Sequence, residues 1–211
     1  LGKKKWQKVK KKPDIVIYSK CNMMHYRRIE EHNKYSTTVL WYMDAFHNYD
    51  FELIEKIKRC NYFISGVEEV ATYSKKYNNN SIFINQCYDD RFNFKKECDK
   101  LYDITFIGSI DSSNIHNNRK PFIDCINTKF NCSVFNNVYG LKHNDIVNQT
   151  KINLNFSPTD ASGVSVRIYK ILAAGGFLLT TPWKDMEQSF IPNIDLVTFT
   201  NNDELLEKIE F

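Results

Sequence analysis

The order of apolar segments around a pair of glycines constrains the fold of this chain more than any other feature. Residues 151–156 have the alternating pattern of a strand, and Val166 to Ala174 have apolar residues at helical spacing. The helix is expected to end at Gly175 and Gly176, because glycine adopts the left-handed conformation of a helix C-cap without strain. The apolar residues 177–180 follow at once as a second strand. A strand, a helix and a strand in this order predict a βαβ unit and a parallel sheet.

The residues just before this helix predict an anion-binding site. Gly163, Val164, Ser165 and Val166 place unpaired backbone N–H groups at the positive end of the helix dipole. Arg167 follows them, and a guanidinium can donate to two phosphate oxygens at once. We therefore expect a nucleotide diphosphate at this helix. An ordinary N-cap by Ser162 or Ser165 is the structural alternative, and it is compatible with binding.

Strand and helix patterns alternate through the whole chain. Strands are expected at residues 14–18, 37–42, 62–65, 81–84, 103–107, 132–135, 152–156, 177–180 and 196–199. Helices are expected at residues 26–32, 51–59, 67–77, 119–127, 145–148, 166–174 and 203–209, the last with Asp203 as its N-cap. The first strand is a short apolar run and is predicted to be buried. The alternation predicts an α/β fold with parallel sheets and right-handed crossovers.

A polar and charged segment between residues 85 and 101 interrupts this alternation. We place a domain boundary there, so that residues 1–98 and 99–211 form two Rossmann-like halves. A hinge is expected near residues 90–101. In such folds the ligand binds at the carboxyl ends of the strands.

Three residues of the second half lie at such strand ends or just beyond them. Gly108 and Ser109 follow the strand at 103–107, where a missing Cβ lets a ligand approach the backbone. Arg119 begins the next helix and can reach a pyrophosphate oxygen. Pairing with a surface carboxylate is the structural alternative for Arg119.

Two motifs of the second half resemble those of a known enzyme family. They are Thr150-Lys-Ile-Asn-Leu-Asn155 and Arg167-Ile-Tyr-Lys-Ile-Leu-Ala-Ala-Gly-Gly-Phe-Leu-Leu-Thr180. Both are similar to motifs of GT-B glycosyltransferases, above all of the CgeB-like (spore maturation protein-like) branch. The resemblance implies a GT-B-like fold with a truncated N-terminal half. It also implies a hexosyltransferase (EC 2.4) that moves a sugar from a UDP- or GDP-linked donor to a hydroxyl of a glycan, lipid-linked or other acceptor.

The resemblance assigns roles to particular residues. Arg119, Lys170 and the loop before the helix would bind the donor diphosphate, and Asn136, Val138 and Tyr139 would contact the nucleobase. Many GT-B enzymes carry glutamates where this chain has Ser162 and Lys170. A catalytically degenerate module that binds a nucleotide or a partner is therefore the alternative to an active enzyme.

The first half offers candidates for the acceptor side. Asp44 and His47 follow the strand at 37–42, and either could accept a proton from an acceptor hydroxyl. The resemblance supports Asp44, because CgeB-like proteins often show an aromatic residue three positions before an aspartate here. A turn or a helix cap is the structural alternative.

Several classes of protein are not supported by any motif. The chain has no D-x-D metal motif, no P-loop, no G-x-S-x-G and no zinc-ligand spacing. We therefore expect no metal and no cofactor beyond the nucleotide-sugar co-substrate. The six cysteines show no C-x-x-C spacing and no apolar run is long enough to span a bilayer, so a cytoplasmic protein is expected.

Lysine occupies seven of the first twelve positions. A solvated tail is the favoured interpretation of this run. A binding surface for nucleic acid or for an anionic membrane is the alternative.

Overall fold

A computed structural model describes residues 12–44, 50–110, 119–157 and 165–211. The chain forms two compact units, residues 1–85 and 86–211, and each has its own sheet. This division lies before the boundary at residue 98 that the sequence pattern favoured. The segment before residue 98 contacts the second unit through backbone N–H groups. Phe94 N donates to Asn144 Oδ1 (3.0 Å), and Lys96 N donates to Asn148 Oδ1 (2.7 Å).

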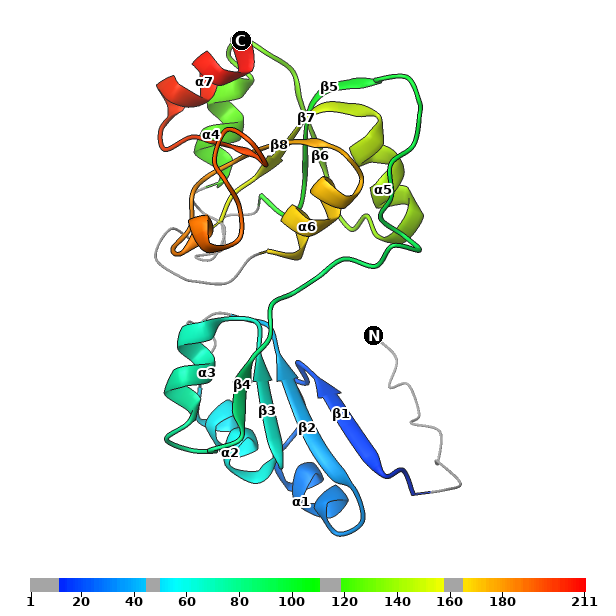
Figure 1. The fold of residues 1–211 in the computed structure, drawn as a ribbon, viewed down its shortest axis with the longest axis vertical. Coiled ribbons are helices and arrows are strands. Elements are labelled where there is room, and N and C mark those ends of the chain that lie inside the picture. Colours follow the sequence, from blue (N-terminus) through cyan, green and yellow to red (C-terminus); the bar gives the residue numbers. More distant parts are fainter. Residues whose placement is uncertain (1–11, 45–49, 111–118, 158–164) are drawn as a thin grey trace. The chain divides into compact units, whose positions relative to one another are not determined.

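The first unit contains a four-stranded parallel sheet, and helices follow the strands along the chain (Figure 1). The strands are β1 (Ile15–Ser19), β2 (Thr37–Tyr42), β3 (Tyr62–Ser65) and β4 (Ser81–Phe83). The helices are α1 (Arg27–Asn33), α2 (Phe51–Arg59) and α3 (Glu68–Ser74). The strand order is β1-β2-β3-β4, so the chain winds in one direction only. Right-handed crossovers then place the helices on one face of the sheet.

That face carries the core of the first unit. Tyr18, Leu40 and Phe63 from three strands pack with Ile29 of α1 and Ile57 of α2.

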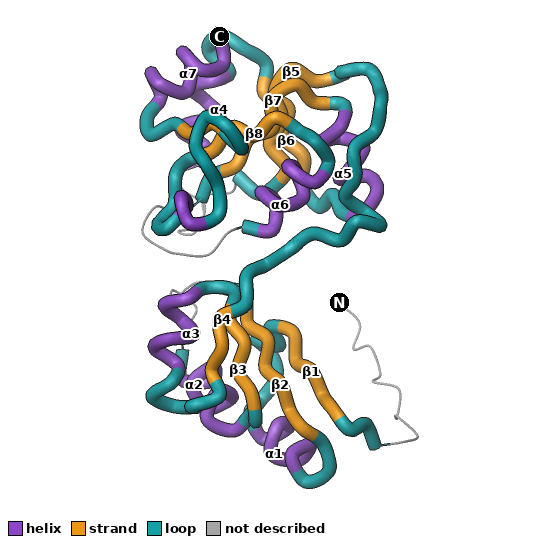
Figure 2. Tube along the Cα trace, viewed as in Figure 1, coloured by secondary structure: helices purple, strands orange, loops and turns teal. Residues whose placement is uncertain are grey.

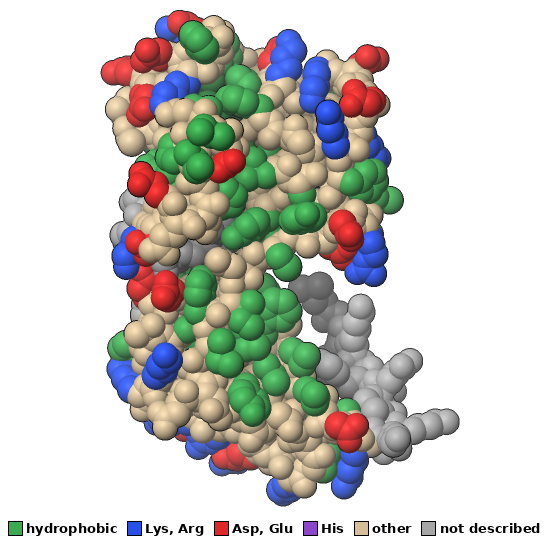
Figure 3. Space-filling view, viewed as in Figure 1, with side chains coloured by type: hydrophobic (Ala, Val, Ile, Leu, Met, Phe, Trp, Pro, Cys, Tyr) green, Lys and Arg blue, Asp and Glu red, His purple; other side chains and the backbone are tan. Residues whose placement is uncertain are grey.

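The opposite face of the same sheet is open and apolar. Ile15 and Ile17 of β1 are 59% and 62% exposed, and Trp41 and Ile82 lie exposed on the neighbouring strands. Figure 3 shows hydrophobic side chains gathered over this unit. The prediction that the first strand is buried is therefore wrong for Ile15 and Ile17, because no described helix covers this side, whereas Val16 and Tyr18 point to the core.

The second unit is a five-stranded parallel sheet that is covered on both faces (Figure 2). The strands are β5 (Tyr102–Ile107), β6 (Cys132–Phe135), β7 (Thr150–Asn155), β8 (Phe177–Thr180) and β9 (Val197–Thr198). The helices are α4 (Arg119–Ile126), α5 (Gly140–Asn148), α6 (Val166–Ala173) and α7 (Asn202–Glu210). Asn201, rather than Asp203, caps α7: its Oδ1 accepts from Glu204 N at 2.9 Å.

The strand order of this sheet, β6-β5-β7-β8-β9, reverses direction between β5 and β7. One core lies under α5 and α6 and includes Val147, Ile168 and Leu178. The other lies under α4 and α7 and includes Ile123 and Leu205. Chain segments therefore leave the carboxyl ends of β5 and β7 towards opposite faces. Such a switch point is where open α/β sheets bind their ligands.

The predicted fold class is confirmed: the protein is α/β, with two Rossmann-like units that each have a parallel sheet. Among the described residues, no helix is both long enough and apolar enough to cross a membrane.

Candidate active site at the switch point of the second unit

Arg167 connects the two strands on either side of the switch point. It lies in the first turn of α6, which Ser165 caps by accepting from Arg167 N (3.4 Å). Its Nε donates to the carbonyl oxygen of Ile107 at the end of β5, at 2.7 Å. Its Nη1 donates to Oδ1 of Asn155 at the end of β7, also at 2.7 Å. The fork of the guanidinium is thus fixed by two neutral acceptors, as the planar geometry of arginine allows.

Asn155 is a site residue that the sequence did not single out for function. It is fully buried, and its Nδ2 donates to Ser157 Oγ (2.8 Å) and to Thr180 Oγ1 (3.0 Å). These two bonds orient its Oδ1 towards Arg167. Its position in the sequence could have indicated a role, because it is the last residue of a buried strand, where a polar side chain needs hydrogen-bond partners.

Gly108 makes room for the guanidinium of Arg167. A Cβ at Gly108 would lie 2.7 Å from Arg167 Nη2 and 2.9 Å from Cζ of Phe106. The sequence predicted that a ligand uses the space of this missing Cβ, whereas in the structure Arg167 occupies it. The ring of Phe106 lies beneath the guanidinium, with 4.9 Å between its centroid and Arg167 Cζ. A cation over an aromatic face is a favourable arrangement.

A second arginine lies against the same ring. Arg119, the first residue of α4, has its Cζ 5.6 Å from the centroid of Phe106, and its Nη1 donates to the carbonyl oxygen of Ser109 (2.9 Å). Burial and then the charge of Arg119 lower the pKa of Arg167 to about 10. Both hydrogen-bond acceptors of the Arg167 side chain among the described residues are neutral, so this part of the site is electropositive.

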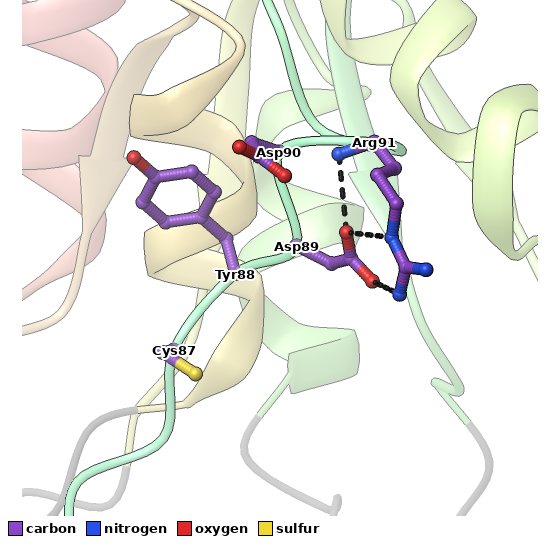
Figure 4. A pocket seen from close by; sticks show the side chains of 5 residues that line it. All are labelled: Cys87, Tyr88, Asp89, Asp90 and Arg91. Atoms are coloured by element: carbon purple, nitrogen blue, oxygen red, sulfur yellow. Dashed lines mark hydrogen bonds and ion pairs between the residues drawn. The ribbon is translucent and has the colours of Figure 1, made fainter.

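Lys170 extends the positive charge by one helical turn. It is partly buried on α6, and burial together with the charge of Arg167 lowers its pKa. With Gly140 and residues 87–89, 92 and 93 it lines a cavity of about 240 Å³. A larger hollow of about 580 Å³ follows residues 87–91, and Figure 4 shows that the carboxylate of Asp89 there faces the guanidinium of Arg91.

Of the remaining predicted donor residues, the structure describes Val166, Asn136, Val138 and Tyr139. Val166 is the partly buried first residue of α6. Asn136 and Tyr139 are exposed after β6, and Val138 packs against the core beneath α5 and α6. Gly163 and Val164 lie outside the described residues.

In the first unit, Asp44 follows β2 and pairs with Lys20, which follows β1. The distance between Lys20 Nζ and Asp44 Oδ2 is 2.7 Å. The two residues meet because the carboxyl ends of adjacent parallel strands lie at one edge of the sheet. His47 lies outside the described residues.

Within the described ranges, no group of three or more His, Cys, Asp or Glu side chains is arranged to hold a metal ion. The predicted absence of a metal remains a prediction.

Comparisons with known proteins agree with this geometry. The protein is similar in structure to the "Glycosylation Associate Protein (Gap123) complex from Streptococcus agalactiae", with a TM-score of 0.55 and 14% identity over 94% of this chain and 47% of that one. It is also similar to TarM, with a TM-score of 0.61 and 13% identity over 95% of this chain and 48% of that one. The chain thus spans about half the length of each of these two structures. No curated protein sequence matches it.

A family model described as "Glycosyl transferase-like" matches residues 96–211, which are more than half of the chain and contain the whole site around Arg167. The chain therefore belongs to the glycosyl transferase-like family.

Proposed function

We propose that this protein transfers a sugar from a UDP- or GDP-linked donor to a hydroxyl acceptor, as a metal-independent hexosyltransferase of the CgeB-like branch. The observation that carries the proposal is the pair of arginines at the switch point, Arg119 and Arg167. Among the described residues, Nη2 of Arg167 has no hydrogen-bond partner, so it can still donate to a phosphate oxygen.

The chemistry follows from where negative charge develops during transfer. As the bond between the sugar C1 and the β-phosphate oxygen breaks, the electron pair moves onto that oxygen. The guanidinium of Arg167, with Arg119 and Lys170, stabilises this charge, and the bonds to Ile107 and Asn155 already fix its orientation. The acceptor hydroxyl forms the new bond to C1, and Asp44, or His47 near it in the sequence, accepts its proton.

The acceptor is a glycan, a lipid-linked sugar or another hydroxyl compound, with nucleic acid as a less favoured choice. The six free cysteines, none of which forms a disulfide, support a cytoplasmic location.

Thermal-shift screening against UDP, GDP, ADP and their sugars tests the proposal. We expect stabilisation by a UDP or GDP compound. Arg119→Gln should weaken that binding by about tenfold or more, because a hydrogen bond to a charged group contributes roughly 1.5–3 kcal/mol. Arg28→Gln is a matched control, since Arg28 is exposed in α1 and pairs only with Glu31 in the described part of the chain. If no nucleotide raises the melting temperature of the folded chain, the proposal fails.

A binding module without turnover is the second candidate. Its support is Lys170, which stands where the resemblance places a carboxylate. If a nucleotide sugar binds but neither transfer nor hydrolysis occurs with a broad acceptor panel, this second function replaces the first.

A further inference from the structure

A buried histidine lies in the helix that begins at the wall of the cavity that Lys170 lines. His143 is in the first turns of α5, whose first residue, Gly140, forms part of the cavity wall. Only 5% of His143 is exposed, and its Nδ1 has no hydrogen-bond partner among the described residues. The next residue, Asn144, is fully buried and its Nδ2 also lacks a partner there. Buried polar atoms normally have partners, so two neighbouring exceptions in the helix that begins at this cavity make these residues candidates for a functional role.

The charges that act on His143 all come from the donor site. Burial is the main reason why its pKa is lowered to about 4, and the positive charges of Lys170 and Arg167 lower it further. Both cations lie on α6, the helix that packs against α5. Of the acidic groups near α5, Asp145 is occupied by an ion pair with Lys96 and Asp89 by an ion pair with Arg91. No described carboxylate contributes to the pKa of His143.

We propose that His143 is a further residue of the donor site and takes up one proton from solvent when the donor diphosphate binds. This inference rests on the proposed function. A diphosphate held by Arg167 and Lys170 cancels the positive charges that oppose protonation of the imidazole. The imidazolium then attracts the bound anion in a region of low dielectric constant. Only the imidazole gains a proton, and no bond of the donor changes in this step.

The sign of the pH dependence follows from linkage. Without ligand the imidazole is neutral above about pH 4. Binding cancels the contribution of the two cations but not that of burial, so the pKa of His143 rises above about 4 and stays below its ordinary value. Affinity therefore rises as the pH falls towards about 4. For each unit by which the ligand raises the pKa, binding strengthens by up to about tenfold at the acidic end of this window. A merely structural histidine would not produce this dependence.

UDP-glucose and GDP-mannose are suitable probes, because their diphosphates carry both negative charges throughout the range from pH 4 to 8. Calorimetry at pH 5 in acetate and in MES gives the number of protons taken up, from the difference between the two binding enthalpies. We expect a positive fraction of one proton for the intact chain and none for His143→Gln. His25→Gln is the matched control, since it removes an exposed histidine of the first unit, and it should behave as the unchanged chain does.

Nuclear magnetic resonance of the histidine side chains tests the protonation of His143 in the unchanged chain, so it does not depend on whether His143→Gln folds. The resonance of His143 should titrate at a higher pH with UDP-glucose or GDP-mannose than without it. Binding with no proton uptake and no change in this titration would overturn the role of His143 and leave the proposed function standing. Failure of both probes to bind at any pH would remove the proposed function and this inference together.

Discussion

At the scale of single residues, Arg167 has a structural task as well as its expected one. The sequence predicts a phosphate ligand at the start of α6, and the residue lies where that prediction puts it. Its Nε and Nη1, however, hold the ends of β5 and β7 together through Ile107 and Asn155. A sequence pattern shows that a cation is near a helix start, but not which neutral groups of other strands it contacts.

Arg167→Lys should therefore destabilise the second unit by about 1–3 kcal/mol, because lysine cannot span both acceptors and leaves a buried one unpaired. Urea denaturation, followed through alkylation of the buried thiol of Cys132 in this unit, measures the change. Arg91→Lys is the control: its ion pair with Asp89 is exposed, and we expect a change below about 0.5 kcal/mol. Equal stabilities of the two variants would show that the bonds of Arg167 contribute nothing.

At the scale of elements, the two faces of the first sheet differ in how much a substitution lowers the stability of the fold. Leu40 of β2 is fully buried against the helices, whereas Ile17 of β1 is 62% exposed on the open face. Leu40→Ala should cost about 2–5 kcal/mol, since it leaves a cavity in the core. Ile17→Ala removes a similar side chain and should cost less than about 1 kcal/mol. Chemical denaturation measures the loss of stability in each variant. If the loss for Ile17→Ala exceeded its expected value, the open face would be covered in solution.

The contrast between these faces also shows how far the sequence could predict the elements. The order of strands and helices, and the parallel class of both sheets, followed from alternating patterns. The exposure of β1 did not, because a short apolar run looks the same whether one or both of its faces are covered. In the site, Arg119, Arg167 and Gly108 could be predicted from nearby sequence features. Asn155 had only its place at the end of a buried strand, and His143 had no such feature, since the importance of both depends on burial and on partners from distant segments.

At the scale of the whole molecule, the two units differ in how they are wound. The first winds in one direction and has one core, whereas the second reverses at β5 and β7 and has two. The reversal creates the switch point and therefore the site. Each core draws its residues from one unit alone, so each unit contains the apolar contacts that stabilise its own sheet.

This separation predicts that the units respond independently to core substitutions. Cys60 is buried in the first unit and Cys132 in the second, and burial raises the pKa of each thiol to about 12, so that neither reacts while folded. Leu40→Ala should lower the urea concentration at which Cys60 becomes alkylated and leave the concentration for Cys132 unchanged. Arg167→Lys should lower the concentration for Cys132 and leave the one for Cys60 unchanged. Pulsed alkylation with mass spectrometry reads both thiols in one sample. If either substitution shifted both thiols equally, the two units would unfold as one cooperative structure, and the stability of the donor site would depend on the core of the first unit.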